Sequence, residues 1–424
     1  MITHYALLPP DPTTQAHLVV ITKASEGLLT LSVAGQSVEV VGAQIPSRSE
    51  YIYHFRVSGL RPGRLHSWSI SGVGDGLPLR TLPGAMPPSG LTGVILSDIH
   101  TGGSGMGSPG DMDVVGAQAP DFALLAGDHA NAFRENYSAN NGAFWITMAQ
   151  DYLSRLSTTF LAPIFAVPGN HDVGNHQWDG TGSVNPDGTY FRTFFPNGAD
   201  MAPTGANHAA PLLGDWMQVL GVDTHSATVA TTAEWAPGAH NDTVPVCLPI
   251  QHSPTVSANI RGSNDPALQA ALRDALYRLF IEADNILFGV AGHVHARTRS
   301  KPLGIVEDDP GGSDNFELSA GGFVVAQESG GYIEAGQGWQ NNRNNADTQP
   351  WFLDYAARGE PSFQRIDISQ GSFRFRTIRD NGATVLDQTW ERPKSRRVQA
   401  VKADGSLSTA VRADGSPSYP RRVA

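Results

Sequence analysis

Cysteine is almost missing from this chain of 424 residues, and the single Cys247 excludes a disulfide bond within it. Charged residues are scarce too, at 16% against about 25% in an average soluble protein. No run of 18 apolar residues occurs, so a membrane-spanning helix is not expected. The residues from Met1 to Asp11 lack the basic and apolar segments of a secretory signal, and we therefore expect a cytoplasmic protein or a part of a released particle.

The chain also has no excess of basic residues, and its net charge is −11. This balance speaks against a general nucleic-acid-binding protein. Residues 393–424 differ from the rest, with seven basic and two acidic residues and therefore a net charge of +5. This segment contains two similar stretches, Lys402–Ser408 and Arg412–Ser418. We expect it to form a basic C-terminal tail that can attach the chain to a protein assembly partner.

Residues 1–85 have the pattern of an all-β domain. Alternating or β-branched runs are separated by turn residues, and they lie at 17–22, 29–33, 38–41, 51–57 and 66–70. The stretch Tyr53–Gly63, followed by Trp68, resembles the paired strands of a fibronectin type III-like (immunoglobulin-like) sandwich. The proline-rich segment Thr81–Pro88 is expected to be a linker, because proline ends a strand and stiffens the chain.

Residues 90–392 change to short apolar strands that alternate with helical segments, which predicts an α/β fold. Five apolar runs mark the expected strands, at 94–97, 122–125, 164–167, 246–250 and 286–289. Three further runs with a hairpin turn at Asp380–Gly382 predict a β meander, at 363–368, 373–378 and 385–390. Residues 174–243 are rich in glycine, asparagine and aromatic residues, and we expect long loops whose aromatic side chains either shape a substrate cleft or pack beneath the loops.

Each of the five apolar runs is followed by residues that can bind a metal ion. Open α/β sheets bind ligands at the carboxyl ends of their strands, so these residues should converge. Oxygen and imidazole donors without thiolate suit Mn, Fe, Zn, Co or Ni. The predicted metal ligands are Asp98, His100, Asp128, Asn170, His252, His293 and His295. Other nearby histidines are expected to be packed in the core or to line the pocket: His129, His176, His208 and His225.

These five motifs resemble those of the calcineurin-like metallophosphoesterases. The resemblance covers about residues 91–392 and implies a two-layer β sandwich flanked by helices, with two metal ions at the strand ends. It implies that Asp128 bridges the two ions. It further implies one ion held by Asp98, His100 and His295, and a second ion held by Asn170, His252 and His293.

The resemblance also implies roles for the two residues that follow Asn170. His171 would face the substrate and act as general acid, and Asp172 would fix its ring. The two cations would bind the phosphoryl oxygens and acidify a bridging water, so that a metal-bridging hydroxide is the expected nucleophile.

Within the family, two features are similar to the purple acid phosphatase branch. One is the β domain ahead of the catalytic domain, and the other is Gly292–Ala296 followed by Arg297. Two features depart from that branch. Asp98-Ile-His100 stands where the branch has Asp-x-Gly, and Asn131 stands where it has an iron-binding tyrosine. Both phosphomonoesters and phosphodiesters therefore stay open as substrates.

The sequence thus predicts a dimetal hydrolase of small phosphoric esters. The alternative is a structural or attachment component of a larger assembly that carries a retained or vestigial phosphoesterase domain. A nuclease is less favoured, because the acidic body offers no basic groove with interleaved aromatic residues. Since residues 1–82 contain none of the predicted ligands, we expect hydrolysis to be independent of them.

Overall fold

The computed structural model describes most of the chain up to residue 254 and shorter segments after it. The described residues are 3–101, 112–130, 141–173, 188–196, 208–225, 229–254, 276, 279, 283, 285–286, 288–293, 297–300, 303–305, 323–325, 333–336, 353–357, 362–391, 399–401 and 407–409. The predicted ligand His295, Asn131 and His176 lie outside them, as does much of the expected loop region 174–243.

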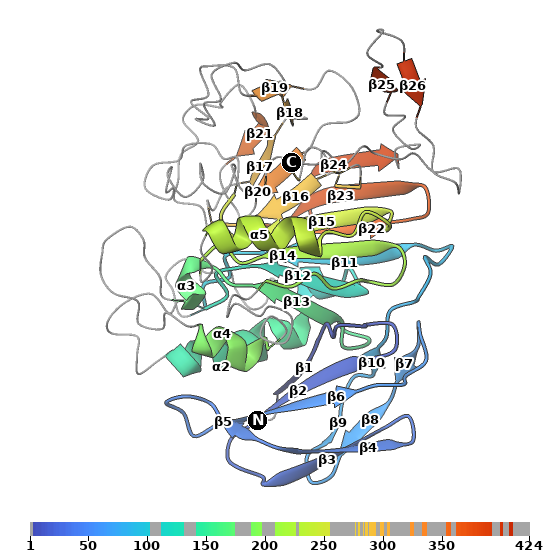
Figure 1. Ribbon diagram of the computed structural model, residues 1–424. Helices are drawn as coiled ribbons and strands as arrows, with labels where there is room; N and C mark the ends of the chain where they lie inside the picture. Colours follow the sequence, from blue (N-terminus) through green and yellow to red (C-terminus); the bar gives the residue numbers. More distant parts are fainter. Residues whose placement is uncertain are drawn as a thin grey trace.

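A ten-stranded sheet runs through the molecule (Figure 1). Strands β11, β12 and β13 at its centre are mutually parallel, and β22 to β24 form the predicted meander along one side. In spatial order the strands are β24 (Thr384–Glu391), β23 (Ser372–Arg379), β22 (Ser362–Ile368), β11 (Leu91–Leu96), β12 (Phe122–Ala126), β13 (Pro163–Val167), β1 (Thr3–Leu7), β2 (Ala16–Thr22), β6 (Tyr51–Val57) and β5 (Ala43–Gln44).

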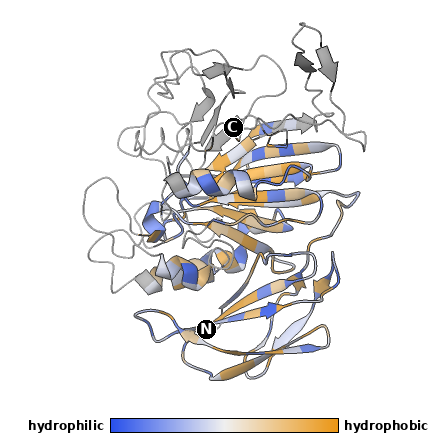
Figure 2. Cartoon of the chain, viewed as in Figure 1, coloured by the Kyte–Doolittle hydropathy of each residue, from blue (hydrophilic) through white to orange (hydrophobic). Residues whose placement is uncertain are grey.

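A six-stranded sheet packs against one face of this large sheet. Its strands are β14 (Met217–Val222), β15 (Val246–Gln251), β16 (Phe288–Ala291), β20 (Ile333–Gly336), β17 (Arg297–Ser300) and β21 (Leu353–Ala357). Apolar side chains from both sheets form one buried cluster, in which Phe165 and Ile95 pack with Leu248 and Phe288. Figure 2 shows the apolar residues concentrated in the strands of this sandwich.

Helices cover the outside of the sandwich. The second face of the large sheet is buried with aromatic residues of the helices, in a cluster that includes Leu96, Trp145 and Phe191. The helices are α1 (Met112–Gly116), α2 (Asn141–Asp151), a 3₁₀ turn η3 (Leu153–Arg155), α3 (Asn170–Val173), α4 (Thr189–Phe194) and α5 (Val229–Ala239). The predicted two-layer β sandwich flanked by helices is therefore confirmed. No helix of the described residues is both long and apolar enough to cross a membrane.

The N-terminal region is all β, as predicted, but it is not a separate body. Its strands β1, β2, β5 and β6 extend the large sheet, because β1 pairs in parallel with β13 through Ala6 opposite Pro163. A second sheet packs over β2 and β6 around Leu18, Phe55 and Trp68. This sheet consists of β4 (Gln36–Val41), β3 (Leu28–Val33), β8 (Trp68–Ile70) and β9 (Gly74–Asp75). One layer of the N-terminal sandwich is thus continuous with the parallel strands β11, β12 and β13.

The segment expected to be a linker is packed onto the sandwich. Leu82 is fully buried. The carbonyl of Pro83 accepts a hydrogen bond from the Trp216 indole N–H at 3.1 Å, and the carbonyl of Gly84 accepts one from the Asp215 N–H at 2.8 Å. The expected linker is therefore not free of the sandwich, because Leu82 and the carbonyls beside it have partners there.

The remaining strands form short antiparallel pairs. These are β7 (Leu65–His66) with β10 (Leu79–Arg80), β18 (Leu303–Ile305) with β19 (Phe323–Val325), and β25 (Gln399–Val401) with β26 (Leu407–Thr409). The last pair lies in the basic tail and overlaps the first of its two similar stretches.

Candidate metal centre

Oxygen donors follow three neighbouring parallel strands of the large sheet. Asp98 follows β11, Asp128 follows β12, and Asn170 follows β13 at the start of helix α3. His100 follows Asp98 by two residues, and all four side chains are buried. Because parallel strands end at one edge of the sheet, their carboxyl ends bring these residues together.

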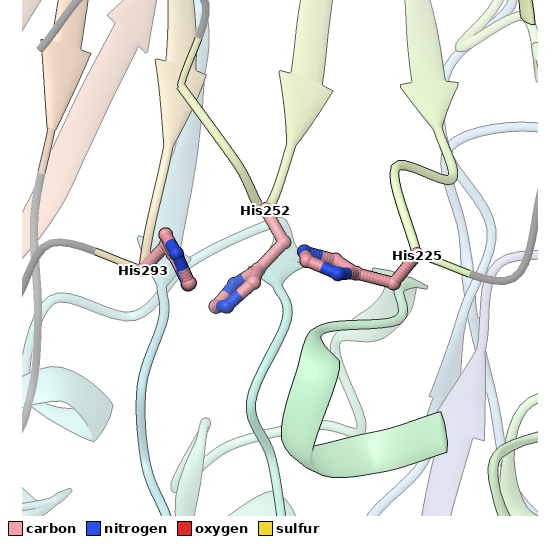
Figure 3. Close-up of side chains that lie close together, drawn as sticks. All are labelled: His225, His252 and His293. Atoms are coloured by element: carbon pink, nitrogen blue, oxygen red, sulfur yellow. The ribbon is translucent and has the colours of Figure 1, made fainter. Parts of the chain in front are cut away.

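Imidazoles follow three neighbouring parallel strands of the six-stranded sheet. His225 follows β14, His252 follows β15, and His293 follows β16 (Figure 3). One ring nitrogen of each lies within 4.8 Å of those of the other two, and all three residues are buried.

The two rows meet between the sheets. Asp128 Oδ2 lies 3.3 Å from Nε2 of His100 and 3.1 Å from Nε2 of His252. Asn170 Oδ1 lies 3.1 Å from Nε2 of His252 and 3.0 Å from Nδ1 of His293. Asp98 Oδ1 lies 3.7 Å from Nε2 of His100. Six of the seven predicted ligands therefore converge, and the seventh lies outside the described residues.

The carboxylates make this site favourable for positive charge. Burial lowers the pKa of His100, but hydrogen bonds to Asp128 and Asp98 outweigh burial and raise the pKa to about 10. Burial is likewise outweighed at His252, where the charge of Asp128 raises the pKa to about 9. Burial would raise the pKa of Asp128, yet the neighbouring His252 and His171 hold it well below its usual range. A cation bound among these groups would supply the positive charge that the site favours.

The backbone around the site is strained in the way that functional sites often are. Seven non-glycine residues of the described chain have positive φ. Four of them are predicted ligands, with φ of 55° at Asp98, 52° at His100, 56° at Asp128 and 72° at His293. Such conformations cost energy and persist where the surroundings hold them in place.

Glycines pack directly against the donor side chains. A Cβ atom on Gly169 would collide with the carboxylate of Asp128, and one on Gly292 would collide with Ser97 and Asp98. The ring of His252 leaves no room for a Cβ on Gly127. The donor types, their convergence and this close fit all agree with a metal centre.

His171 lies at the rim of the centre. Its backbone N–H donates to Asp128 Oδ1 at 2.8 Å, and its Nε2 lies 3.9 Å from Asp128 Oδ2. Its ring packs edge-on against His100 with 4.4 Å between ring centroids. The side chain is 17% exposed, whereas those of His100 and Asp128 are almost completely buried.

Asp172 makes contacts different from those we expected. Its Oδ1 accepts hydrogen bonds from the backbone N–H groups of His129 and Ala130, at 2.9 and 3.1 Å, and its Oδ2 accepts one from Gly169 at 2.8 Å. The carboxylate also lies 3.7 Å from Nε2 of His129. These bonds tie the turn after β12 to the turn after β13, so Asp172 positions the loops that carry Asp128 and Asn170.

The described histidines that were expected to be packed or to line the pocket fall into two groups. His129 and His208 are packed: the ring of His129 donates to the Val167 carbonyl at 3.0 Å, and His208 stacks on Trp235 with 4.5 Å between centroids. His225 instead joins the imidazole row. Burial and the neighbouring imidazoles of His252 and His293 hold the pKa of His225 well below its usual value, which leaves the ring neutral. Strand β14, which precedes His225 and places its ring in this row, was not predicted from the sequence.

The family model of the calcineurin-like phosphoesterases matches residues 93–297, which carry this centre. This part of the chain is therefore similar to the calcineurin-like phosphoesterases. The match supports a metal-dependent hydrolase domain that acts on phosphoric esters. Of the described residues, the clusters of histidine and aspartate that can hold a metal ion all lie within this domain.

Several solved structures also match the chain, and one of them, PhoD, shares its fold. The structure of PhoD is 11% identical, with a TM-score of 0.66 over 92% of this chain and 90% of that one. GAP50, the anchor in the inner membrane complex of Plasmodium, is 12% identical, with a TM-score of 0.44 over 72% of this chain and 90% of that one. Vps29 complexed with Zn²⁺ from Entamoeba histolytica is 11% identical, with a TM-score of 0.28 over 71% and 99%. No curated protein matches the chain.

Proposed function

We propose that this phosphoesterase domain uses two cations held between the two sheets. The observation that supports this most strongly is the place of Asp128 Oδ2, which lies 3.3 Å from His100 and 3.1 Å from His252. A carboxylate has two oxygens, so Asp128 can serve a cation on each side. Asp98 and His100, together with His295, are proposed for one cation, and Asn170, His252 and His293 for the other.

When bound, the two cations would neutralise charge on the phosphoryl oxygens and lower the pKa of a bound water to generate the nucleophile. Asn170 contributes an oxygen donor without charge. The donor side chains are buried, and low exposure to water strengthens the electrostatic attraction for the anionic ester.

We assign His171 as the general acid. Its side chain is 17% exposed, and its Nε2 lies 3.9 Å from Asp128 Oδ2, in a group with His100 and Asp128 whose ligand atoms lie within 4.8 Å of one another. The leaving alkoxide needs a proton, and an imidazole in this position can supply it. The hydrogen bond from the His171 N–H to Asp128 fixes the backbone of the acid relative to the centre.

The proposal is tested by elemental analysis of the purified chain together with hydrolysis of a phosphomonoester and a phosphodiester. Two metals per chain and turnover of at least one ester are expected. Metal-free protein without turnover after reconstitution with Mn²⁺, Fe²⁺, Zn²⁺, Co²⁺ or Ni²⁺ would favour the attachment role. The ratio of kcat/KM for the two esters decides the substrate class between monoester and diester.

A further inference from the structure

His225 occupies the outer position of a row of three imidazoles. Strands β14, β15 and β16 are adjacent and parallel, so their carboxyl ends place His225, His252 and His293 side by side (Figure 3). The ring centroid of His225 lies 5.3 Å from that of His252 and 5.8 Å from that of His293. The ring of His225 therefore faces the same space as two proposed ligands.

The ring is held in this position by neighbouring loops. Nε2 of His225 lies 2.9 Å from Oγ of Ser253, the residue directly after His252. The backbone N–H of His225 donates to Asp223 Oδ1 at 3.0 Å, and the backbone N–H of Ser253 donates to Thr224 Oγ1 at 3.2 Å. These bonds lock the turn after β14 to the turn after β15. Metal-binding imidazoles commonly depend on such outer hydrogen bonds for their orientation.

The surroundings of His208, a packed and buried histidine, differ from those of His225. His208 accepts a hydrogen bond from the Asp223 N–H at 2.9 Å and stacks on Trp235 at an interplanar angle of 11°. The ring of His225 instead contacts two imidazoles, those of His252 and His293. Three imidazoles brought this close together suit a shared cation.

We propose that His225 supplies a third imidazole to the cation held by His252 and His293, with Ser253 holding its ring. This inference rests on the proposed metal-dependent function. It adds a donor that the resemblance to the family does not imply, and a nitrogen-rich site of this kind would favour Zn²⁺, Co²⁺, Ni²⁺ or Fe²⁺ over Mg²⁺.

The test uses the full chain, stripped of metal and titrated with Co²⁺, whose visible absorption reports its ligands. His225→Ala should weaken one of two Co²⁺ ions by at least about 10–100-fold and change the visible spectrum of that ion. Ser253→Ala should weaken the same ion less. His225→Gln keeps the volume and the hydrogen-bonding capacity of the side chain, and it replaces the alanine variant if that variant fails to fold. His240→Ala is the matched control, because its ring binds Asn285 ahead of β16 at the opposite end of the strands.

Each outcome decides the inference. Unchanged Co²⁺ affinity and spectrum in both His225 variants, with a raised KM for the ester, would overturn it and make His225 a substrate contact. Unchanged affinity, spectrum and KM would overturn it in favour of packing. A native chain that binds two Co²⁺ ions and hydrolyses no ester would refute the proposed function, while the titration would still decide the role of His225. A native chain that binds no Co²⁺ would overturn both.

Discussion

Asp128 Oδ2 lies 3.1 Å from Nε2 of His252, although Asp128 follows a strand of the ten-stranded sheet and His252 follows one of the six-stranded sheet. The other nitrogen of His252 donates to the carbonyl of Ala126, the last residue of β12, at 2.8 Å. The ring thus joins the two layers, with one nitrogen on the backbone of the large sheet and the other directed at the proposed cation.

Asp128→Asn should weaken both cations, because one anionic side chain is proposed to serve both. We expect metal content to fall below two per chain and kcat/KM to fall by at least about 100-fold. Elemental analysis after dialysis and ester hydrolysis measure the two effects. Asp113→Asn, on an exposed side chain of α1, is the control. Two tightly held metals and a native rate in Asp128→Asn would refute the bridging role.

His171→Ala should leave metal content nearly intact and reduce hydrolysis according to the leaving group. An alkyl phosphate leaves as a poor alkoxide and should lose roughly 10²–10⁴ in kcat/KM, the usual span for general acid catalysis. A nitrophenyl ester leaves as a stable anion and should lose much less. Equal losses for both esters would make His171 a phosphate-positioning residue, and loss of a metal would make it a ligand.

Gly292→Ala should disturb the centre without a change of charge. The new Cβ would approach Asp98 Oδ2 to 2.8 Å and the Ala126 carbonyl to 2.9 Å, besides colliding with Ser97. We expect a loss of about 1–3 kcal/mol in the free energy of unfolding and a weaker metal affinity. Gly371→Ala, where a Cβ meets open space, is the control. Native metal affinity in Gly292→Ala would show that the close fit is not needed.

Removal of residues 1–85 should prevent folding, in contrast to the expectation that hydrolysis is independent of this region. The truncation uncovers the edge of β13 and removes the buried Tyr5, whose hydroxyl donates to the Phe194 carbonyl at 3.0 Å. In the full chain, Leu7→Ala should cost about 2–5 kcal/mol of unfolding free energy, measured in urea. A soluble, active chain beginning at Met86 would contradict the structural dependence.

Two histidines, His17 in β2 and His54 in β6, should make the folded chain less stable in acid. His17 Nε2 lies 3.0 Å from His54 Nδ1, and His54 Nε2 donates to the Thr193 carbonyl at 2.9 Å. Burial lowers the pKa of His54 to about 4, and burial together with His54 and Arg56 lowers that of His17 well below its usual value. Both rings are neutral in the folded chain, whereas the unfolded chain protonates them below about pH 6.5.

The contribution of these two histidines to the unfolding free energy should therefore be constant above about pH 6.5 and fall as the pH drops from there toward about 4, by up to about 1.4 kcal/mol per pH unit for each histidine. Urea titrations of metal-free protein at pH 7, 6 and 5 measure this slope. His54→Gln, which can still donate to Thr193, should show a smaller slope. An equal slope in the variant would place the acid sensitivity elsewhere.

Much of the sandwich could be predicted because its strands are short apolar runs bounded by polar turns. The ligands followed from the same pattern, since Asp98, Asp128 and His252 come one or two residues after such runs. Strand β1 was not predicted, because its partner β13 is distant in sequence and two prolines follow closely. Pairing between distant segments depends on packing that no local pattern records.

Strand β14 was missed for a related reason, and His225 with it. Met217–Val222 lies within a region whose glycines and aromatic residues indicated loops, although all six residues are buried in the six-stranded sheet. The contacts of Asp172 could not be predicted either, because three backbone N–H groups from two turns converge on its carboxylate only in the folded chain.

The continuous sheet also determines when the protein can fold during its synthesis. Ala6 pairs with Pro163, and Leu91 pairs with Ile368. At typical translation rates, roughly 10–30 s separate the appearance of β1 from that of β13. Until Pro163 has left the ribosome, the nascent N-terminal hairpin presents an unpaired strand edge and the apolar side chains of Tyr5 and Leu7, a surface that invites aggregation and binding by chaperones.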